Sequence, residues 1–198
     1  GSGVDEMFES MPEPLRVIFV GEVSELTSPE GYLNSQIFVL LIPVVFIIYC
    51  VFRGASAIAG DEEDGTLEMI LSNPVSRFEF VLHKFVANFI SAMILGFVFW
   101  GAIYTGVLIV DMDISPLRIW EATLSGVLLG MVFGNFALVL GCVFGGRNMS
   151  AGVSGGLAIF AYLANVLLPL VESMESARRA SPFYYYISAD PLSNGFNF

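Results

Sequence analysis

Residues that could perform chemistry are sparse in this sequence and do not form a catalytic or metal-binding pattern. His83 is the only histidine, so a two-histidine zinc motif and an ordinary Ser-His-Asp triad both lack parts. The acidic run 61–64 loosely matches the start of a calcium loop, but the twelfth position is Ser72 and not a bidentate glutamate. No G-x-x-x-x-G-K-S/T motif occurs, and the single lysine, Lys84, follows a histidine. We therefore expect no catalytic residue, no metal site and no cofactor in this chain.

The remaining polar residues in apolar surroundings have simpler explanations. Asn88, Asn135 and Asn165 lie within apolar runs, where an unpaired amide is costly. Hydrogen bonding between helices is the favoured interpretation, and a polar patch on a substrate route is the alternative. Asp111 and Asp113 form a lone D-x-D pair, which is typical of a solvated turn.

The composition is that of a membrane protein. Hydrophobic residues make up 56% of the 198 residues and charged residues only 14%, where a soluble domain has about 25%. The formal net charge is −11, from 19 acidic residues against 8 Lys and Arg, which excludes the basic footprint of a nucleic-acid-binding protein. The acidic balance fits either a salt-rich habitat or an ordinary acidic membrane protein. No basic stretch precedes an early apolar run, so we expect no signal peptide.

Four charge-free stretches of 22 to 26 residues are each long enough to cross a hydrocarbon core about 30 Å thick. They are apolar on all sides, unlike the helices of a soluble bundle, and only helices satisfy their backbone groups within lipid. The sequence therefore predicts an all-α membrane protein with four transmembrane helices and amphipathic interfacial helices. Within a single domain, 1–198, the predicted boundaries are an amphipathic segment 1–35, spans 36–59, 82–110, 118–145 and 149–171, a polar segment 60–81 between the first two spans, and an aromatic segment 172–198.

The polar segment 60–81 has the pattern of two short helices separated by a proline. Its acidic residues precede apolar residues at helical spacing, which favours a helix that starts near Asp61, since carboxylates stabilise a helix N-terminus. That helix should end before Pro74. Ser76 and Glu79 match a capping box at the start of the next helix. From the pattern alone, a solvated loop that rests on lipid headgroups fits equally well.

The same segment resembles a known family. The stretch AIAGDEEDGTLEMILSNPVSRFEFVLHKF (57–85) is similar to the segment that follows the second span in ABC-2 type transporter permeases, and the similarity continues through 156–172 and 181–195. In that family the segment is a cytoplasmic coupling helix that contacts a separate ATPase subunit. The resemblance implies ATPase-coupling roles for Glu62, Glu63, Gly65, Thr66, Leu67, Glu68 and Leu71, with Pro74, Ser76 and Arg77 forming the elbow.

The resemblance also implies an orientation and an assembly. Lysine and arginine residues are balanced between the two sides, so charge leaves the orientation open, but the family places 60–81 in the cytoplasm and segments 1–35 and 172–198 outside. Family members usually have six spans, so a first span should precede this chain and a sixth should follow it. The implied partners are an ABC ATPase subunit that binds ATP and Mg²⁺, a second permease copy in a homodimer, and the lipids of the plasma membrane, with no nucleic acid.

Glycines recur at four-residue spacing in the later spans, which lets helices approach closely in lipid. Packing within one subunit is the favoured interpretation, and a movable contact between two permease copies is the alternative. The predicted packing residues are Gly126, Gly130, Gly134, Gly152 and Gly156.

Two functions remain as hypotheses at this point. The first is the permease subunit of an ATP-driven exporter, in which a separate ATPase pushes on the segment 60–81. The four charge-free stretches offer no Asp, Glu, Lys or Arg at membrane depth, so an ion-driven relay within the membrane is disfavoured. The second is a membrane scaffold or assembly factor that binds a soluble partner through the same segment without transport.

Overall fold

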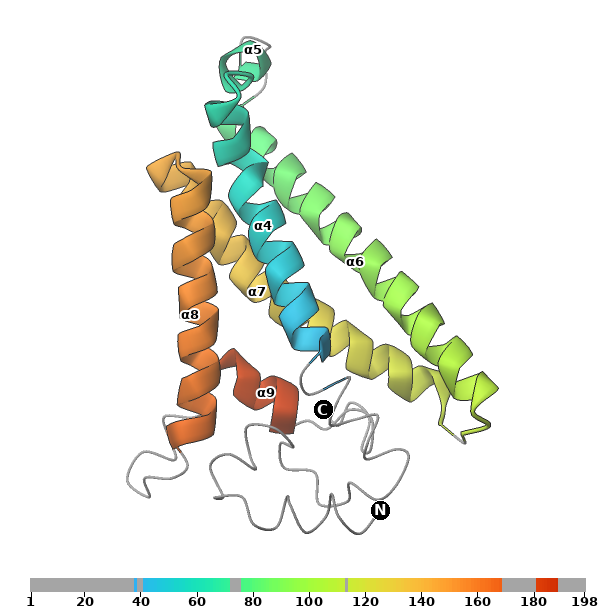
Figure 1. The fold of residues 1–198 in the computed structure, drawn as a ribbon. Helices are drawn as coiled ribbons and strands as arrows, with labels where there is room; N and C mark the ends of the chain where they lie inside the picture. The colour runs from blue at the N-terminus through green and yellow to red at the C-terminus, as the bar shows by residue number, and fades with distance from the viewer. Residues whose placement is uncertain (1–37, 39–40, 72–75, 113, 169–180, 189–198) are drawn as a thin grey trace. The chain divides into compact units, whose positions relative to one another are not determined.

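The computed structural model describes residues 38, 41–71, 76–112, 114–168 and 181–188 (Figure 1). Within these residues the regular structure is helical and includes no strand. The helices are α4 (Ile42–Glu63), α5 (Leu67–Leu71), α6 (Arg77–Ile109), α7 (Pro116–Phe144), α8 (Arg147–Leu167) and α9 (Pro182–Ser188). The predicted segment 1–35 lies outside the described residues, as does most of 172–198.

Four of these helices, α4, α6, α7 and α8, are long and apolar enough to cross a membrane. This confirms the predicted all-α membrane fold with four spans. The helix ends differ from the predicted boundaries mainly around the segment 60–81, because α4 continues to Glu63 and α6 begins at Arg77. With 33 residues, α6 is about 50 Å long, well above the thickness of a hydrocarbon core of about 30 Å. An untilted α6 would therefore extend beyond the hydrocarbon core, and a tilted one would fit more of its length within the lipid.

The chain divides into two compact units. Among the described residues, 44–71, 76–99 and 127–160 form the first unit, and 38, 41–43, 100–112, 114–126, 161–168 and 181–188 form the second. The first unit contains most of α4 and all of α5. It also contains α6 as far as Phe99, α7 from Val127 onward and α8 as far as Phe160. It therefore contains every described residue of the predicted coupling set.

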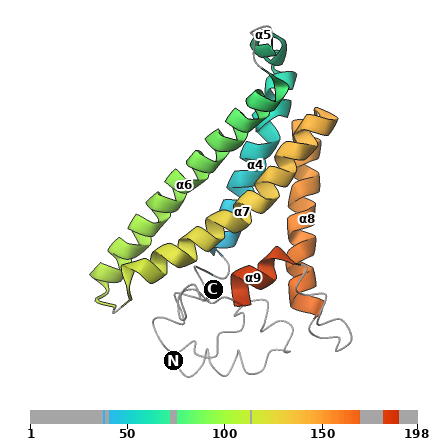
Figure 2. The ribbon, with the colours of Figure 1, turned by 180° about the vertical axis from the view of Figure 1, so that it is seen from behind.

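In the first unit, α4 and α7 lie side by side, as both views show (Figures 1 and 2). A Cβ atom added at Gly130 would lie 2.7 Å from the carbonyl oxygen of Phe46, and one at Gly134 would lie 2.8 Å from that of Cys50. A Cβ atom at Gly54 would lie only 2.0 Å from the carbonyl oxygen of Gly134. Because these contacts join backbone to backbone, we call Gly54, Gly130 and Gly134 the glycine seam.

Gly130 and Gly134 thus lie against the backbone of α4 within the same chain. Gly126 is also buried. The glycines of α8 differ, because a Cβ atom at Gly152 or Gly156 would meet nothing within 4 Å. These two positions do not contribute to the packing seen here.

The contacts between α4 and α6 in the first unit are made by side chains. The Phe46 and Phe99 rings lie 5.5 Å apart between centroids. The hydroxyl groups of Tyr49 and Ser91 share a hydrogen bond between the two helices. Asn88, a turn before Ser91, is buried in α6. The pairing of α4 with α6 thus depends on side-chain interactions, whereas its pairing with α7 depends on the absence of side chains.

Aromatic residues order the second unit at two places. Trp100 donates a hydrogen bond from Nε1 to the carbonyl oxygen of Pro116 at 3.0 Å, across the turn between α6 and α7. Its ring stacks on Tyr104 and meets the edge of Trp120. Such rings suit the interface between lipid and water. The same turn contains Asp111, which is exposed with φ of 57°, consistent with the predicted solvated turn, while Asp113 lies outside the described residues.

The short helix α9 is held within the second unit. Ser181 donates a hydrogen bond from Oγ to the carbonyl oxygen of Ala161 at 3.0 Å. The Phe183 ring meets the edge of Tyr162 with centroids 5.4 Å apart, and the Tyr186 hydroxyl donates to the carbonyl oxygen of Phe38. These contacts place α9 against α8 and Phe38, and the predicted interfacial position of the aromatic segment stays a prediction.

Candidate functional site

The segment 60–81 opens with the C-terminal end of α4, which is closed by a Schellman motif. The Thr66 N–H donates to the carbonyl oxygen of Asp61 at 2.9 Å, and the Gly65 N–H donates to that of Glu62 at 3.1 Å. Gly65 has φ of +70°, a conformation that favours glycine at this position. The prediction of a helix starting near Asp61 is therefore wrong, because the acidic residues 61–63 form the last turn of α4.

The short helix α5 follows and is anchored at its first residue. Leu67 packs against the buried side chains of Ala57, Ile58, Phe80 and Leu138. The next two residues, Glu68 and Met69, are exposed, with 66% of Met69 accessible. The helix therefore presents a carboxylate and a thioether to the surroundings from a fixed base. The side chain of Leu71 and all of Pro74 lie outside the described part of the chain.

The elbow at the start of α6 carries the predicted capping box. The Ser76 N–H donates to Oε2 of Glu79 at 3.0 Å, and the Glu79 N–H donates to Oγ of Ser76 at 3.2 Å. These reciprocal hydrogen bonds confirm the capping box. Bonds from the Ser76 backbone and hydroxyl hold the pKa of the Glu79 carboxyl below its usual value. Arg77 and Phe78 are exposed beside the cap, with 76% of Phe78 accessible.

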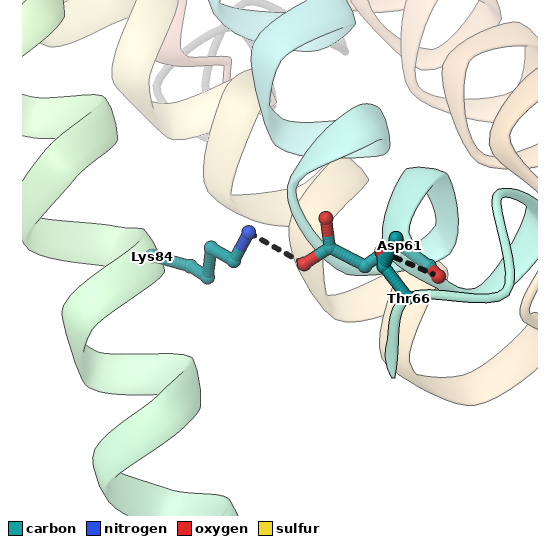
Figure 3. A network of polar contacts seen from close by, with 3 residues as sticks. All are labelled: Asp61, Thr66 and Lys84. Carbon is teal, nitrogen blue, oxygen red and sulfur yellow. Dashed lines mark hydrogen bonds and ion pairs between the residues drawn. The ribbon is translucent and has the colours of Figure 1, made fainter. Parts of the chain in front are cut away.

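An ion pair links α4 to α6 just beneath α5. Lys84 Nζ lies 2.5 Å from Oδ2 of Asp61, and both side chains are largely shielded from solvent (Figure 3). The ammonium group also lies 5.3 Å from the centroid of the Phe80 ring, within range of a cation–π interaction. The Asp61 carbonyl oxygen meanwhile accepts a hydrogen bond from the Thr66 hydroxyl at 3.1 Å (Figure 3). Asp61 thus binds the base of α5 and the first turns of α6 together.

The next two carboxylates turn toward the connection between α7 and α8. Oε1 of Glu63 accepts a hydrogen bond from the Arg147 N–H at 2.9 Å, which satisfies a free donor at the start of α8. Gly145, with φ of +65°, lies so close to Glu62 that an added Cβ atom would be 2.7 Å from its Oε2. Both carboxylates are nonetheless exposed in part. The acidic residues therefore diverge, and within the described residues no three His, Cys, Asp or Glu side chains converge on one point.

The structure brings most of the predicted coupling residues to one end of the first unit. Some of them are exposed, and others hold the segment in place. Glu68 and Arg77 are exposed, Gly65 and Thr66 form the turn, and Leu67 is an anchor. Sequence reasoning missed Met69 and Phe78, although both are apolar residues next to charged ones. It also missed the ion pair of Lys84, for which the only signal was that this is the single lysine.

Comparison with known proteins gives the family of the chain. The family described as ABC-2 family transporter protein matches residues 7–187, which is most of the sequence. The chain belongs to the ABC-2 family. A search of curated proteins and a search of solved structures each gave no significant match. As an ABC-2 permease, the chain is a membrane transport domain, and its helical, multi-pass fold agrees with that role.

Proposed function

We propose that this ABC-2 permease is the membrane-spanning subunit of an ATP-driven exporter, and that residues 60–81 form its contact with a separate ATPase subunit. Family membership supports a permease role. The printed sequence carries no G-x-x-x-x-G-K-S/T motif, so hydrolysis of ATP with its Mg²⁺ is assigned to the partner. In this proposal the segment 60–81 faces the cytoplasm, two permease copies assemble in the plasma membrane, and transport is outward.

The observation that carries the proposal is the set of contacts that hold the start of α5 against the first unit. Its first residue, Leu67, packs against a buried cluster, and the Schellman motif at Gly65 fixes the chain immediately before it. The exposed Glu68 and Met69 lie on a single helical turn. A short helix that is rigid at its base and exposed along its outer face can receive a push from a soluble partner and pass it to the spans.

Site-specific crosslinking tests the contact. A photoreactive amino acid at Met69 should crosslink to an ATPase that carries a nucleotide-binding motif, in membranes of cells that produce the whole transporter. The matched control is Ile94, which is 59% exposed in the apolar part of α6 and should give no such product. Absence of an ATPase product from Met69 would contradict the proposal.

A labelling experiment tests the orientation. In a chain with Cys50 and Cys142 replaced, Met69→Cys should react with a membrane-impermeant maleimide only after the cells are opened. Reaction in intact cells would place the segment outside and exclude a cytoplasmic ATPase as its partner.

Hydrolysis measurements separate a transporter from a scaffold. Glu68→Arg should leave the spans folded and lower the stimulation of the bound ATPase, since the Glu68 side chain is exposed and is not part of the buried cluster. Leu67→Asp and Glu63→Arg are less informative, because Leu67 packs against the buried cluster and Glu63 is hydrogen-bonded to α8. An ATPase that binds the permease but hydrolyses ATP at an unchanged rate would favour the scaffold function.

A further inference from the structure

We infer that the last turn of α4 is an internal joint, in which Asp61 and Glu63 are positioning residues that pass a displacement of α5 to α6 and α8. This inference rests on the proposed function, because it assigns a route for movement that begins at the ATPase contact. It changes the role of Glu63, which the family resemblance would place on the docking surface.

The first step of the route joins α5 to Asp61. The backbone carbonyl oxygen of Asp61 accepts two hydrogen bonds from Thr66, one from N–H at 2.9 Å and one from Oγ1 at 3.1 Å. Thr66 immediately precedes α5. The base of α5 therefore cannot move without moving the backbone of Asp61.

The second step joins Asp61 to α6. The carboxylate of the same residue lies 2.5 Å from Lys84 Nζ (Figure 3). Oδ2 is shielded from solvent, so separation from Lys84 would leave a buried charge without compensation. Lys84 also lies over the Phe80 ring, and Phe80 packs in the cluster that holds Leu67. The ion pair is thus part of a packed contact and not a loose surface pair.

The third step joins α4 to α8. Successive helical residues are rotated by about 100°, so Asp61 and Glu63 project about 200° apart and reach helices on different sides of α4. Oε1 of Glu63 binds the Arg147 N–H at 2.9 Å. Because Gly145 lacks a side chain, the neighbouring carboxylate of Glu62 can lie against the turn before α8. One turn of α4 therefore holds α5, α6 and α8.

The test uses the permease purified with its ATPase from cells that produce the whole transporter, with ATP alone as the added ligand. Lys84→Met should lower ATPase stimulation per bound ATPase about tenfold, while the amount of bound ATPase stays unchanged. Lys84→Arg should retain stimulation within about twofold, and the exchange Asp61→Lys with Lys84→Asp should restore most of it. The matched control is Arg53→Met, since Arg53 is an exposed cation on α4 with no ion pair among the described residues.

Glu63 distinguishes a joint from a docking surface. Glu63→Gln keeps an oxygen that can accept the Arg147 N–H, so stimulation should persist, whereas Glu63→Ala should lose it. If both variants lose ATPase binding equally, Glu63 is a docking residue and the inference fails. Equal stimulation in wild type, Lys84→Met and Glu63→Ala would also overturn it.

A second measurement does not require the ATPase. Spin labels at Met69 and Val86, both exposed, report the distance between α5 and the start of α6 by pulsed electron paramagnetic resonance. Lys84→Met should widen the distance distribution about twofold, and Arg53→Met should leave it unchanged. An unchanged distribution in Lys84→Met would refute the joint while leaving the ATPase contact standing. Failure of the wild-type chain to bind any ATPase would instead refute the proposed function and the inference with it.

Discussion

Substitution of Gly54 by alanine is the most direct test of how the spans pack. The added Cβ atom would lie 2.0 Å from the Gly134 carbonyl oxygen, about 1.4 Å short of the 3.4 Å at which ordinary contact begins. Both partners at this point are backbone, so no side chain can move aside. Relief requires α4 and α7 to separate locally, which would also loosen the contact of Gly130 with Phe46. Overpacking typically lowers the free energy of unfolding by about 1–3 kcal/mol, and we expect Gly54→Ala to lower it by about 3 kcal/mol or more.

The assay is reversible unfolding in mixed detergent micelles, followed by helical circular dichroism. Gly156→Ala is the matched control, since a Cβ atom there meets nothing within 4 Å. In α8 the control should be neutral or slightly stabilising, because alanine favours a helix by about 1 kcal/mol over glycine. If Gly54→Ala and Gly156→Ala unfold at the same detergent fraction, the close approach of α4 and α7 does not exist in the protein.

Two predictions concern the ends of helices in the segment 60–81. Because hydrogen bonds lower the pKa of Glu79, the capping box stabilises the elbow above the usual carboxyl pKa of about 4.3, and this stabilisation disappears as the pH falls through the lowered value. Amide exchange at 77–80 should therefore rise on acidification, and Glu79→Gln should abolish that pH dependence. Gly65→Ala should destabilise the end of α4 by about 1–2 kcal/mol in thermal unfolding because of its positive φ, whereas Gly60→Ala, where the nearest atom would be 3.6 Å away, should not.

Features that depend on local sequence could be predicted. The spans follow from charge-free runs that only helices can carry through lipid, and the capping box at Ser76 follows from two side chains three residues apart. In each case the partners lie within one or two helical turns, so spacing alone determines the outcome.

The end of α4 could not be predicted from the acidic run. Carboxylates favour a helix start, yet Asp61 and Glu63 lie in a final turn, where the helix dipole disfavours them. Their compensation comes from Lys84 and the Arg147 N–H, which are distant in the sequence. Gly65 was the local signal for the helix end, because glycine is the usual residue one position beyond it.

The glycine pattern predicted helix faces that are lined by small residues, but it did not predict which helix packs against each face. Gly130 and Gly134 share their four-residue spacing with Gly152 and Gly156, yet only the first pair is in close contact. The difference lies in Gly54 and the backbone of α4, which no pattern within α7 or α8 reveals. Contacts between helices that are distant in the chain need the structure.

The glycine seam also sets an order of events during synthesis. Gly54 and Gly134 are 80 residues apart, and α6 is made between them. At about 5–20 residues per second, the ribosome produces α7 about 4–16 s after α4. In that interval the face of α4 that contains Gly54 has not yet met α7. The helix α6 can already contact α4 through the Tyr49–Ser91 hydrogen bond and the Lys84–Asp61 ion pair. The side-chain contacts can therefore form while the nascent chain is still growing, and the backbone contact comes later.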